Sequence, residues 1–387
     1  MSKPITENII EESAIEILQS QGWEYANGKE ISPEGLFCER ENYSQIVLVN
    51  RLRNTIAKIN PEIPLDAQEA AIQKVLRIAS PELLHNNEEF HRLLVEKVKI
   101  PYQQNGYERS HEVALIDFEN TGNNQFLIVN QYTIIENNQN KRPDVLLFVN
   151  GLPLVVIELK NAASENANIK SAYQQIQTYK AIIPSLFIYN AICILSDGLE
   201  CKAGSVSADL SRYMTWKTAD GIKEASRFKP QLETLLKGML QPATLLDLVR
   251  NFIVFEKSKK EDAKTGLIQI QTVKKLAAYH QYYAVNKAVQ SSVVASGING
   301  DKRGGVVWHT QGSGKSLSMV FYSGKLITSP EMRNPTIVVI TDRNDLDDQL
   351  FDTFASSVQL LRQEPVQAEN REHLKELLEV ASGGIVF

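Results

Sequence analysis

The sequence predicts an α/β protein built in two parts, and three observations indicate this fold class. Between about residues 113 and 195, short apolar runs are separated by turn residues, which is typical of buried strands. Helical periodicity dominates before these runs and recurs between them, so the first part is expected to be a sheet flanked by helices. After residue 301, strand and helix patterns alternate, which indicates a parallel α/β lobe.

Composition is that of an ordinary soluble globular protein. The chain has 387 residues, long enough for two or three domains, with 43% hydrophobic and 22% charged residues. The longest apolar stretch, 145–159, is too short and too broken to span a bilayer, and the N-terminal sequence predicts no signal peptide. Cys38, Cys193 and Cys201 lack metal-type spacing, so we expect reduced thiols and a cytoplasmic location.

The net charge of −5 argues against a stand-alone nucleic-acid binder, because such domains are usually basic. If this chain binds DNA, it either carries a local basic groove or leaves most of the contacts to partners. The second alternative would mean that another chain recognises the DNA sequence.

In the first part, helices are expected before strands. An amphipathic helix is predicted over residues 5–20, and the region 40–100 is expected to be mostly helical with a break near Pro61 and Pro64. The next elements are predicted in this order: strands over 113–118, 125–134, 145–149 and 154–159, a helix over about 166–183, and a strand over 186–195.

The second part is reached through a less regular region. Its charged run, residues 257–264, is expected to be a solvated linker or loop. The elements predicted after it are a helical segment (270–292), a strand (305–308), a phosphate-binding loop, a helix to about residue 327 and a strand (336–340). Residues 383–387 look like the start of a further strand, so we expect this domain to be truncated.

Asp144, Glu158 and Lys160 form a pattern that suits metal-dependent phosphodiester hydrolysis. Asp144 precedes one apolar strand, and Glu158 lies near the end of the next. The two carboxylates are expected to bind Mg²⁺, with the Leu159 carbonyl as a third oxygen ligand. Glu158 and Lys160 share one face of the strand, so Lys160 can orient or activate the attacking water or stabilise developing negative charge. The alternative is a salt-bridged strand end.

The register of the two strands decides whether this site can form. With a strict two-residue loop at 150–151 and regular pairing, Asp144 would lie opposite Ile157, and Glu158 would point to the other face. We therefore predict either a three-residue loop, 150–152, or a β-bulge nearby. Either feature places Asp144 opposite Glu158, whereas a regular two-residue hairpin would exclude the metal site.

Gln175 and Tyr179 are four apart on the next predicted helix and therefore share one face. They are expected to contact the substrate backbone or to support the metal site. Together with the patterns around Asp144 and Glu158-x-Lys160, they resemble the PD-(D/E)xK nucleases of the RecB-like branch. This resemblance implies a restriction-endonuclease-like mixed sheet flanked by helices, and a glutamate from the first helix in the site.

Glu11 is the best match to that glutamate, ahead of Glu7 and Glu12, although each of them also fits a solvated helix face. His111 has no second ligand nearby in the sequence and is interpreted as structural. The catalytic set that the resemblance implies is therefore completed by Glu11.

A second motif follows a predicted strand and opens a helix. It comprises Gly312, Ser313, Gly314, Lys315 and Ser316. Its backbone N–H groups and the helix N-terminus are expected to bind the phosphates of ATP. Lys315 would contact the β- and γ-phosphates, and the Ser316 hydroxyl would ligate Mg²⁺. His309 stands where the strict pattern has glycine, but the spacing of the two glycines is kept.

Two further polar positions fit a helicase-like ATPase. Gln281 resembles the glutamine that reads the adenine edge in superfamily 2 helicases, and an exposed helical glutamine is the alternative. Asp342 could be the acidic Mg²⁺ residue of such a site, but residues 341–349 look more like a DNA-contacting motif of these helicases. The acidic box is then expected beyond Phe387.

Taken in order, the nuclease pattern and residues 308–316 and 341–349 resemble the restriction (R) subunit of type I restriction–modification enzymes over almost the whole chain. The resemblance implies an endonuclease domain (1–203), a connecting segment (204–265) and a first RecA-like motor lobe (266–387). It also implies Mg²⁺ and ATP as cofactors, and methylation (M) and specificity (S) subunits as partners. Translocation of duplex DNA would then be coupled to cleavage of unmethylated DNA.

Two alternatives remain open at this point. A DNA-repair nuclease–helicase commonly carries its nuclease after the motor, whereas here the nuclease comes first. A non-catalytic docking domain attached to a motor is the other alternative. Because the acidic box and the second motor lobe are missing from these 387 residues, we expect no ATP hydrolysis or translocation by this chain alone.

Overall fold

A computed structural model describes residues 7–104, 106–161, 168–261, 268–342, 344–380 and 382–387. The chain divides into two compact units, Met1–Arg250 and Asn251–Phe387. The sequence-based division had placed its boundaries after residues 203 and 265. Residues 204–250 therefore pack with the first unit rather than forming a separate connection. In the part of the chain that is described, no helix is long and apolar enough to cross a membrane.

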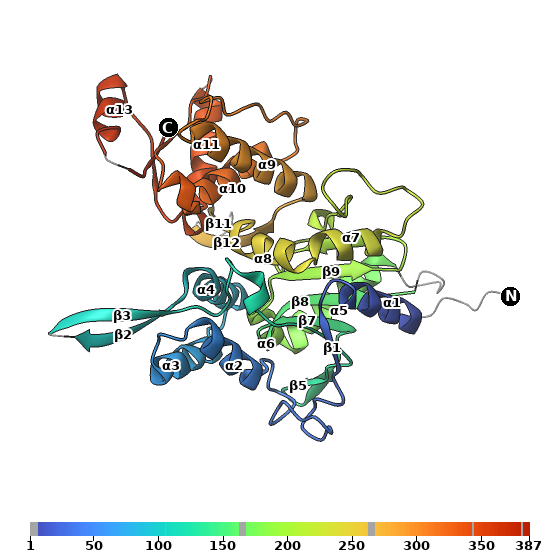
Figure 1. Ribbon diagram of the computed structural model, residues 1–387. Helices are drawn as coiled ribbons and strands as arrows, with labels where there is room; N and C mark the ends of the chain where they lie inside the picture. The colour runs from blue at the N-terminus through green and yellow to red at the C-terminus, as the bar shows by residue number, and fades with distance from the viewer. Residues whose placement is uncertain (1–6, 105, 162–167, 262–267, 343, 381) are drawn as a thin grey trace. The chain divides into compact units, whose positions relative to one another are not determined.

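Six strands form the central sheet of the first unit (Figure 1). Their spatial order is β1 (Glu24–Asn27), β4 (Phe126–Asn130), β7 (Val145–Val149), β8 (Leu152–Leu159), β9 (Ile192–Ser196) and β10 (Cys201–Gly204). The β1–β4 and β8–β9 pairs are parallel and the other three are antiparallel, so the expected mixed sheet is confirmed. Every residue of β4, β7, β8 and β9 is buried, as expected for apolar runs covered on both faces.

Helices pack on this sheet at the predicted places. α1 (Glu7–Gln19) buries four apolar residues at helical spacing and contacts β1 and β8. α5 (Ile169–Ile182) begins at a capping box and contacts β8 and β9. The other helices are α2 (Val49–Ile59), α3 (Leu65–Leu76), α4 (Leu83–Glu96), α6 (Pro184–Ile188), α7 (Gln231–Met239) and α8 (Pro242–Asn251). The unit also contains a two-stranded ribbon and a short strand pair, β5 (Ile134–Glu136) and β6 (Gln139–Lys141).

That ribbon, β2 (Val98–Gln104) and β3 (Tyr107–Val113), extends away from the helices of the first unit (Figure 1). The predicted helix up to residue 100 and the predicted strand over 113–118 are therefore wrong. Most β3 side chains are polar and exposed, so no period-2 apolar pattern marks the strand. His111 lies on β3 and stacks on Tyr102, with ring centroids 4.1 Å apart.

Two other predicted strands are shorter than expected. Pro184 begins α6, because proline fits the first turn of a helix, and β9 starts only at Ile192. The predicted strand 125–134 ends at Asn130, since Gln131 takes a φ of 55° that breaks the pairing.

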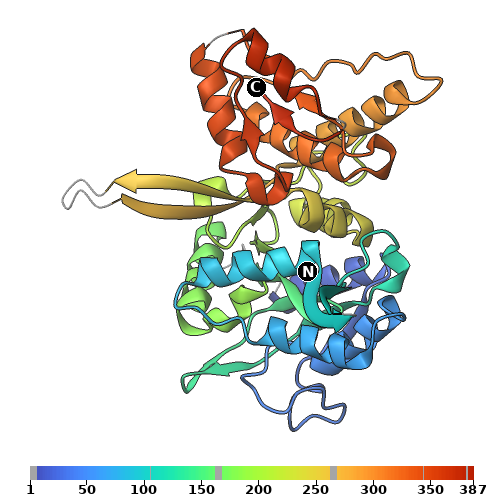
Figure 2. The same ribbon diagram turned by 90° about the vertical axis from the view of Figure 1, so that its left-hand side faces the viewer.

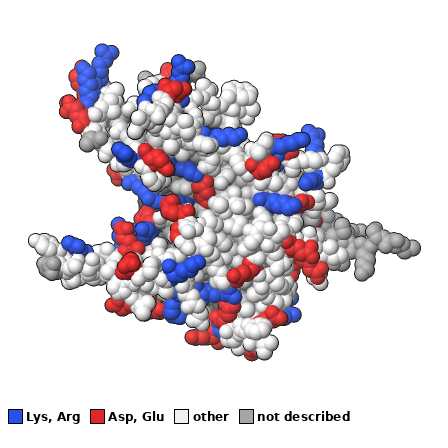
Figure 3. All heavy atoms as spheres, viewed as in Figure 1, with Lys and Arg blue, Asp and Glu red and all other residues white. Residues whose placement is uncertain are grey.

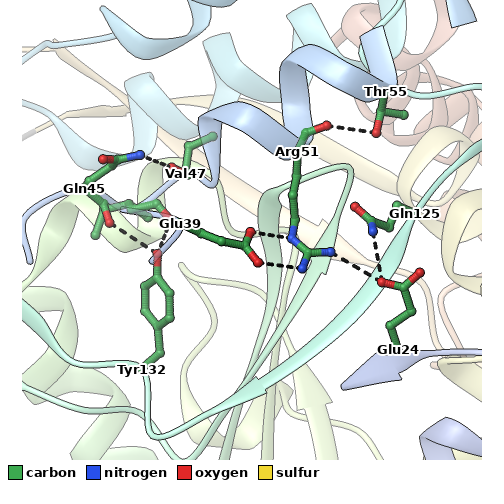
Figure 4. Close-up of polar contacts among 9 residues, drawn as sticks. Glu24, Glu39, Gln45, Val47, Arg51, Thr55, Gln125 and Tyr132 are labelled. Atoms are coloured by element: carbon green, nitrogen blue, oxygen red, sulfur yellow. Dashed lines mark hydrogen bonds and ion pairs between the residues drawn. The ribbon is translucent and has the colours of Figure 1, made fainter. Parts of the chain in front are cut away.

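The start of α2 holds the turn between β7 and β8. The Leu48 N–H donates to the Gly151 carbonyl at 2.9 Å, and a Cβ on Gly151 would come within 2.4 Å of the Leu48 carbonyl oxygen. Arg51 donates to both oxygens of Glu39 at 2.5 and 2.6 Å and lies 3.4 Å from Glu24 on β1 (Figure 4). These ion pairs connect α2 to β1 and to the preceding loop.

Arg51→Ala is expected to lower the free energy of unfolding of the first unit by about 1–3 kcal/mol. The side chains of Arg51 and Glu39 are each 20% exposed, so Glu39 would lose a charge-assisted partner in partly desolvated surroundings. Arg53→Ala is the matched control, because Arg53 and Glu69 are 45% and 41% exposed and their pair contributes less than about 1 kcal/mol. Chemical denaturation of both variants measures the difference, and equal losses would contradict this role of Arg51.

The second unit is a parallel α/β lobe, as predicted. Its parallel sheet has three strands in the order β13 (Ile337–Val338), β15 (Ile385–Val386) and β14 (Pro365–Val366). Its helices are α9 (Tyr279–Ser296), α10 (Lys315–Thr328), α11 (Asn344–Ala355), α12 (Val358–Leu361) and α13 (Arg371–Leu377). Phe354 and Phe387 pack edge to face in its core, with ring centroids 5.1 Å apart.

Three expectations for this unit were wrong. An antiparallel ribbon, β11 (Ile253–Glu261) and β12 (Ile268–Leu276), replaces the predicted loop and the start of the predicted helix (Figure 2). Residues 262–264 of the charged run lie outside the described residues. A two-stranded ribbon can form with little alternation of apolar and polar residues, so its lysine-rich sequence does not indicate strands. The predicted strand 305–308 is irregular and Trp308 is 84% exposed, because no described strand pairs with it.

Candidate nuclease site and phosphate-binding loop

The hairpin of β7 and β8 contains the β-bulge that the sequence predicts. Its loop has two residues, and the register then shifts by one in the middle of β7. Beyond the bulge, Val145 pairs with Ile157. Asp144 and Glu158 are the next residues outward and therefore lie opposite each other. The extra residue on β8 thus places both carboxylates on one face.

The two carboxylates lie at the end of the hairpin in surroundings with little water. Asp144 Oδ2 accepts a hydrogen bond from the Leu159 N–H at 2.7 Å. Glu158 is only 1% exposed, and its Oε2 atom has no hydrogen-bond partner among the described residues. A buried carboxylate oxygen is costly unless a proton or a cation lies beside it.

Lys160 lies on the same side of β8. Its Nζ atom donates to Glu158 Oε1 at 2.6 Å and to the Leu159 carbonyl at 2.9 Å. A second carboxylate, Glu7 on α1, lies 3.9 Å from the same nitrogen. The ammonium group is therefore held beside two of the three oxygen-bearing groups that the sequence predicts as metal ligands.

Burial sets the protonation of this cluster. It raises the pKa of Asp144 to about 6, although the hydrogen bond from Leu159 and the charge of Lys160 oppose the rise. It raises the pKa of Glu158 to about 8, and the neighbouring charge of Asp144 adds to the effect. For Lys160, burial lowers the pKa, but the adjacent Glu158 and Asp144 outweigh it and raise the pKa. Lys160 is therefore a stable cation at neutral pH.

The predicted helix pair, Gln175 and Tyr179, lies on α5. Tyr179 is buried, and its hydroxyl donates to the Arg142 carbonyl at 3.3 Å. Burial and the charge of Glu158 raise the pKa of Tyr179, while a hydrogen bond with Gln175 opposes the rise. The tyrosine is therefore neutral and lies beside Glu158, whereas Gln175 is connected to the carboxylates through Tyr179.

α1 brings two glutamates toward the site, and the negative charges of Glu7 and Glu11 both raise the pKa of Asp144. Glu11, the residue favoured from the sequence, accepts a hydrogen bond from Asn130 Nδ2 at 2.6 Å. Sequence reasoning missed Asn130, which ends β4 and pairs in register with Val145. The available signal was a polar residue directly after four buried apolar ones.

These groups fit a divalent cation. The described residues contain no group of three or more His, Cys, Asp or Glu side chains that could hold a metal. Two carboxylates and a carbonyl are nevertheless a common protein contribution to Mg²⁺, which keeps several of its waters. Glu158 has an unpartnered oxygen, and burial raises the pKa of both carboxyl groups; a divalent cation beside them would offset this cost of burial.

The second unit forms the predicted phosphate-binding loop. Gly312 and Gly314 take φ values of 77° and 79°, a conformation that glycine adopts without strain. Gly314 is the N-cap of α10, and the Ser316 side chain lies in the first turn of that helix. Lys315 Nζ donates to the carbonyls of His309 and Thr310, each at 3.2 Å. The lysine thus lies across the loop, where phosphate oxygens would replace the carbonyls as its partners.

Gln281 connects α9 to this loop. It is only 5% exposed, so the alternative of an exposed helical glutamine is wrong. Its Oε1 atom accepts from the Ala278 N–H at 2.9 Å, and its Nε2 atom donates to the Gly314 carbonyl at 3.0 Å. The neighbouring His280 lies 3.0 Å from the carbonyl oxygen of Ser313. Both side chains therefore touch the backbone of the phosphate loop.

Asp342 follows β13 and is exposed. The preceding Thr341 hydroxyl donates to Asp347 Oδ1 at 2.7 Å on α11. Arg343, the next residue of this motif, lies outside the described residues. No described contact joins Asp342 to the phosphate loop.

Charge on the molecular surface is mixed. On the face drawn in Figure 3, Lys and Arg side chains are interspersed with Asp and Glu, and no broad band of one sign forms on either unit. This face therefore offers no basic groove of the kind that the sequence analysis required for unassisted DNA binding.

Comparison with known proteins matches both units. A family described as "Type I restriction enzyme R protein N terminus" matches residues 4–212, and one described as "SWI2/SNF2 ATPase" matches residues 280–387. The chain is 46% identical to the type I restriction enzyme HindI endonuclease subunit of Haemophilus influenzae, over 99% of this chain and 36% of the relative. It is 33% identical to a Methanocaldococcus jannaschii protein, provisionally named the type I restriction enzyme MjaIXP endonuclease subunit, over 98% of this chain and 36% of the relative. The chain thus spans about a third of the length of these relatives.

Proposed function

The chain belongs to the type I restriction enzyme R protein family, and we propose that it supplies the nuclease and the first motor lobe of a restriction subunit. The complete subunit would hydrolyse ATP to translocate duplex DNA and would cleave unmethylated DNA in the cytoplasm. It would act in a complex with methylation and specificity subunits. The observation that carries this proposal is the bulge that sets Asp144 opposite Glu158, with Lys160 beside them.

Asp144, Glu158 and the Leu159 carbonyl would hold Mg²⁺ at this site. When bound, the metal would stabilise negative charge on the scissile phosphate and lower the pKa of a water. Lys160, a stable cation, would stabilise the charge of the attacked phosphate rather than accept a proton. Tyr179 and Gln175 would orient the carboxylates and contact the DNA backbone. Glu11 would complete the oxygen ligands from the side of α1.

The phosphate loop would bind ATP in the second unit. Backbone N–H groups of residues 312–316 and the N-terminus of α10 would hold the phosphates, and Ser316 would bind the nucleotide's Mg²⁺. Lys315 would exchange its two carbonyl partners for the β- and γ-phosphates. Gln281 donates a hydrogen bond to the Gly314 carbonyl and would also contact the adenine edge. It would thereby connect the adenine to the phosphate loop.

Two variants of the full-length subunit, assembled with its partner subunits, test this assignment. Asp144→Ala is expected to reduce Mg²⁺-dependent DNA cleavage at least about 100-fold while sparing ATP hydrolysis, assembly and DNA binding. Lys315→Ala is expected to abolish ATP hydrolysis and, with it, cleavage. If Asp144→Ala cleaved normally, the first unit would be a docking domain and the nuclease assignment would fail.

A further inference from the structure

The polar residue Asn130 has a position at the nuclease site that the proposed mechanism does not use. It is the last residue of β4 and pairs in register with Val145, the residue next to Asp144. On its other side it pairs with Asn27 of β1. The side chain is only 8% exposed. A buried primary amide is costly to leave unpaired, so its hydrogen bonds define what it does.

Both ends of the Asn130 amide have a partner. Its Nδ2 atom donates to Glu11 Oε1 at 2.6 Å, and its Oδ1 atom accepts from the Tyr25 hydroxyl at 3.0 Å. If the amide were turned over, its carbonyl oxygen would face the Glu11 carboxylate and the two would repel. Glu11 therefore selects one orientation of the amide, with the N–H groups toward the carboxylate, and the Tyr25 hydroxyl donates to the amide oxygen in that orientation.

Glu11 has a neutral partner in this contact, whereas Glu7 lies near a charged one. Glu7 lies 3.9 Å from the ammonium of Lys160, whereas no cation is paired with Glu11 among the described residues. Glu11 nevertheless lies near Asp144, because its partner Asn130 pairs in register with Val145, the next residue along the chain. The neutral amide therefore holds a negative carboxylate near two others without neutralising it.

We propose that Asn130 is a positioning residue, hydrogen-bonded to Tyr25, that holds the Glu11 carboxylate toward the metal site. The inference rests on the proposed nuclease function and extends it to two residues outside the nuclease motif. A lysine in place of Asn130 would neutralise Glu11, and an aspartate would repel it. An amide with a fixed orientation directs the carboxylate and leaves its charge available to a divalent cation.

Calorimetric titration of Mn²⁺ into the 387-residue chain tests the proposal. Asn130→Asp and Asn130→Ala are expected to weaken Mn²⁺ binding about 10–100-fold, and Tyr25→Phe to weaken it by less, in the same direction. Tyr43→Phe is the matched control, because it removes an exposed hydroxyl that donates to Glu34 at 2.7 Å away from the site. Glu12→Gln controls for a change of charge on α1, since Glu12 is exposed.

A double-mutant comparison separates positioning from general support of the fold. In a Glu11→Gln background, Asn130→Ala is expected to cause no further loss of Mn²⁺ affinity. A loss that persists there, or a loss that appears only as a lower Tm, would overturn the proposal in favour of a structural role. Tyr25→Phe is the second variant to test if Asn130→Asp fails to fold. If a folded Tyr25→Phe variant retains the Asn130–Glu11 contact and its Mn²⁺ affinity is unchanged, Tyr25 has no part in the positioning.

The outcomes also distinguish this inference from the proposed function. If the wild-type chain binds no Mn²⁺ at all, the nuclease assignment fails and the positioning role fails with it. If the wild type binds Mn²⁺ and Glu158→Gln does not, but the Asn130 variants bind as the wild type does, only the positioning role is wrong.

Discussion

Replacing Lys160 by alanine is expected to slow DNA cleavage by the complete restriction complex about 100–1,000-fold while ATP hydrolysis continues at its normal rate. The Lys160 ammonium is held beside Glu158 and the Leu159 carbonyl, and its raised pKa keeps it charged. In the proposed site, its removal would take away positive charge where the attacked phosphate would gain negative charge. Single-turnover cleavage rates and a parallel ATPase assay measure the two activities.

Lys180→Ala provides the matched control for this prediction. Lys180 is a partly buried lysine on α5 that donates to the Val206 carbonyl at 2.8 Å and to Gln177 at 2.7 Å. No described contact joins it to the carboxylates, so its loss is expected to leave the cleavage rate unchanged. Equal cleavage rates for the two variants would mean that Lys160 contributes only to packing. Normal cleavage by Lys160→Ala would mean that Lys160 is not part of the site.

Glu158→Gln is expected to make the metal-free protein more stable, with the largest gain above pH 8. Burial raises the pKa of Glu158 to about 8, so the folded chain keeps a proton that the unfolded chain loses near the ordinary pKa of a glutamate. Stability therefore falls as the pH rises between these two values. The uncharged glutamine avoids this cost while keeping the shape of the side chain.

Thermal unfolding in the presence of a chelator measures this effect. A gain of about 1 kcal/mol raises the Tm by about 2–4 °C in a unit of this size. The gain is expected to shrink as the pH falls toward 5, where wild-type Glu158 is protonated. Glu200→Gln is the control, since Glu200 is exposed and pairs with Lys202 at 3.4 Å. A lower Tm for Glu158→Gln than for the wild type at pH 8 would contradict the cost assigned to this carboxylate.

Such a gain in stability would mean that stability and function favour different residues in the hairpin. Glu158 is the last residue but one of β8, in which every residue is buried, and an apolar side chain would be more stable there. The proposed cation site would account for two carboxylates being kept there at the expense of stability. The raised pKa values of Asp144 and Glu158 reflect the electrostatic cost of burying these two carboxylates.

Much of the fold and of the motifs could be predicted because strong periodic signals coincide with elements of the structure. The apolar runs at β4, β7 and β8 and the glycines of the phosphate loop are such signals. The bulge was predictable for a different reason. Asp144 and Glu158 must lie on one face of the sheet to form the site, but a two-residue turn with regular pairing would place them on opposite faces. Only an extra residue brings them to the same face.

The misplaced elements lack such a signal. The ribbons β2–β3 and β11–β12 pair through their backbones while many of their side chains are polar, so binary patterning does not reveal them. The segment 305–308 has the composition of a strand, yet among the described residues it has no neighbour to pair with. Asn130 was missed because its role depends on Glu11 and Tyr25, which lie more than 100 residues earlier in the chain.

The most direct test of the nuclease assignment is a calorimetric titration of Mn²⁺ into the wild-type chain and into Glu158→Gln, both without nucleotide. The account predicts that the wild type binds the metal and that Glu158→Gln, although folded and more stable, binds none at this site. Equal binding by the two proteins would contradict the account, because the carboxylate that the bulge turns toward Asp144 would then not be a ligand.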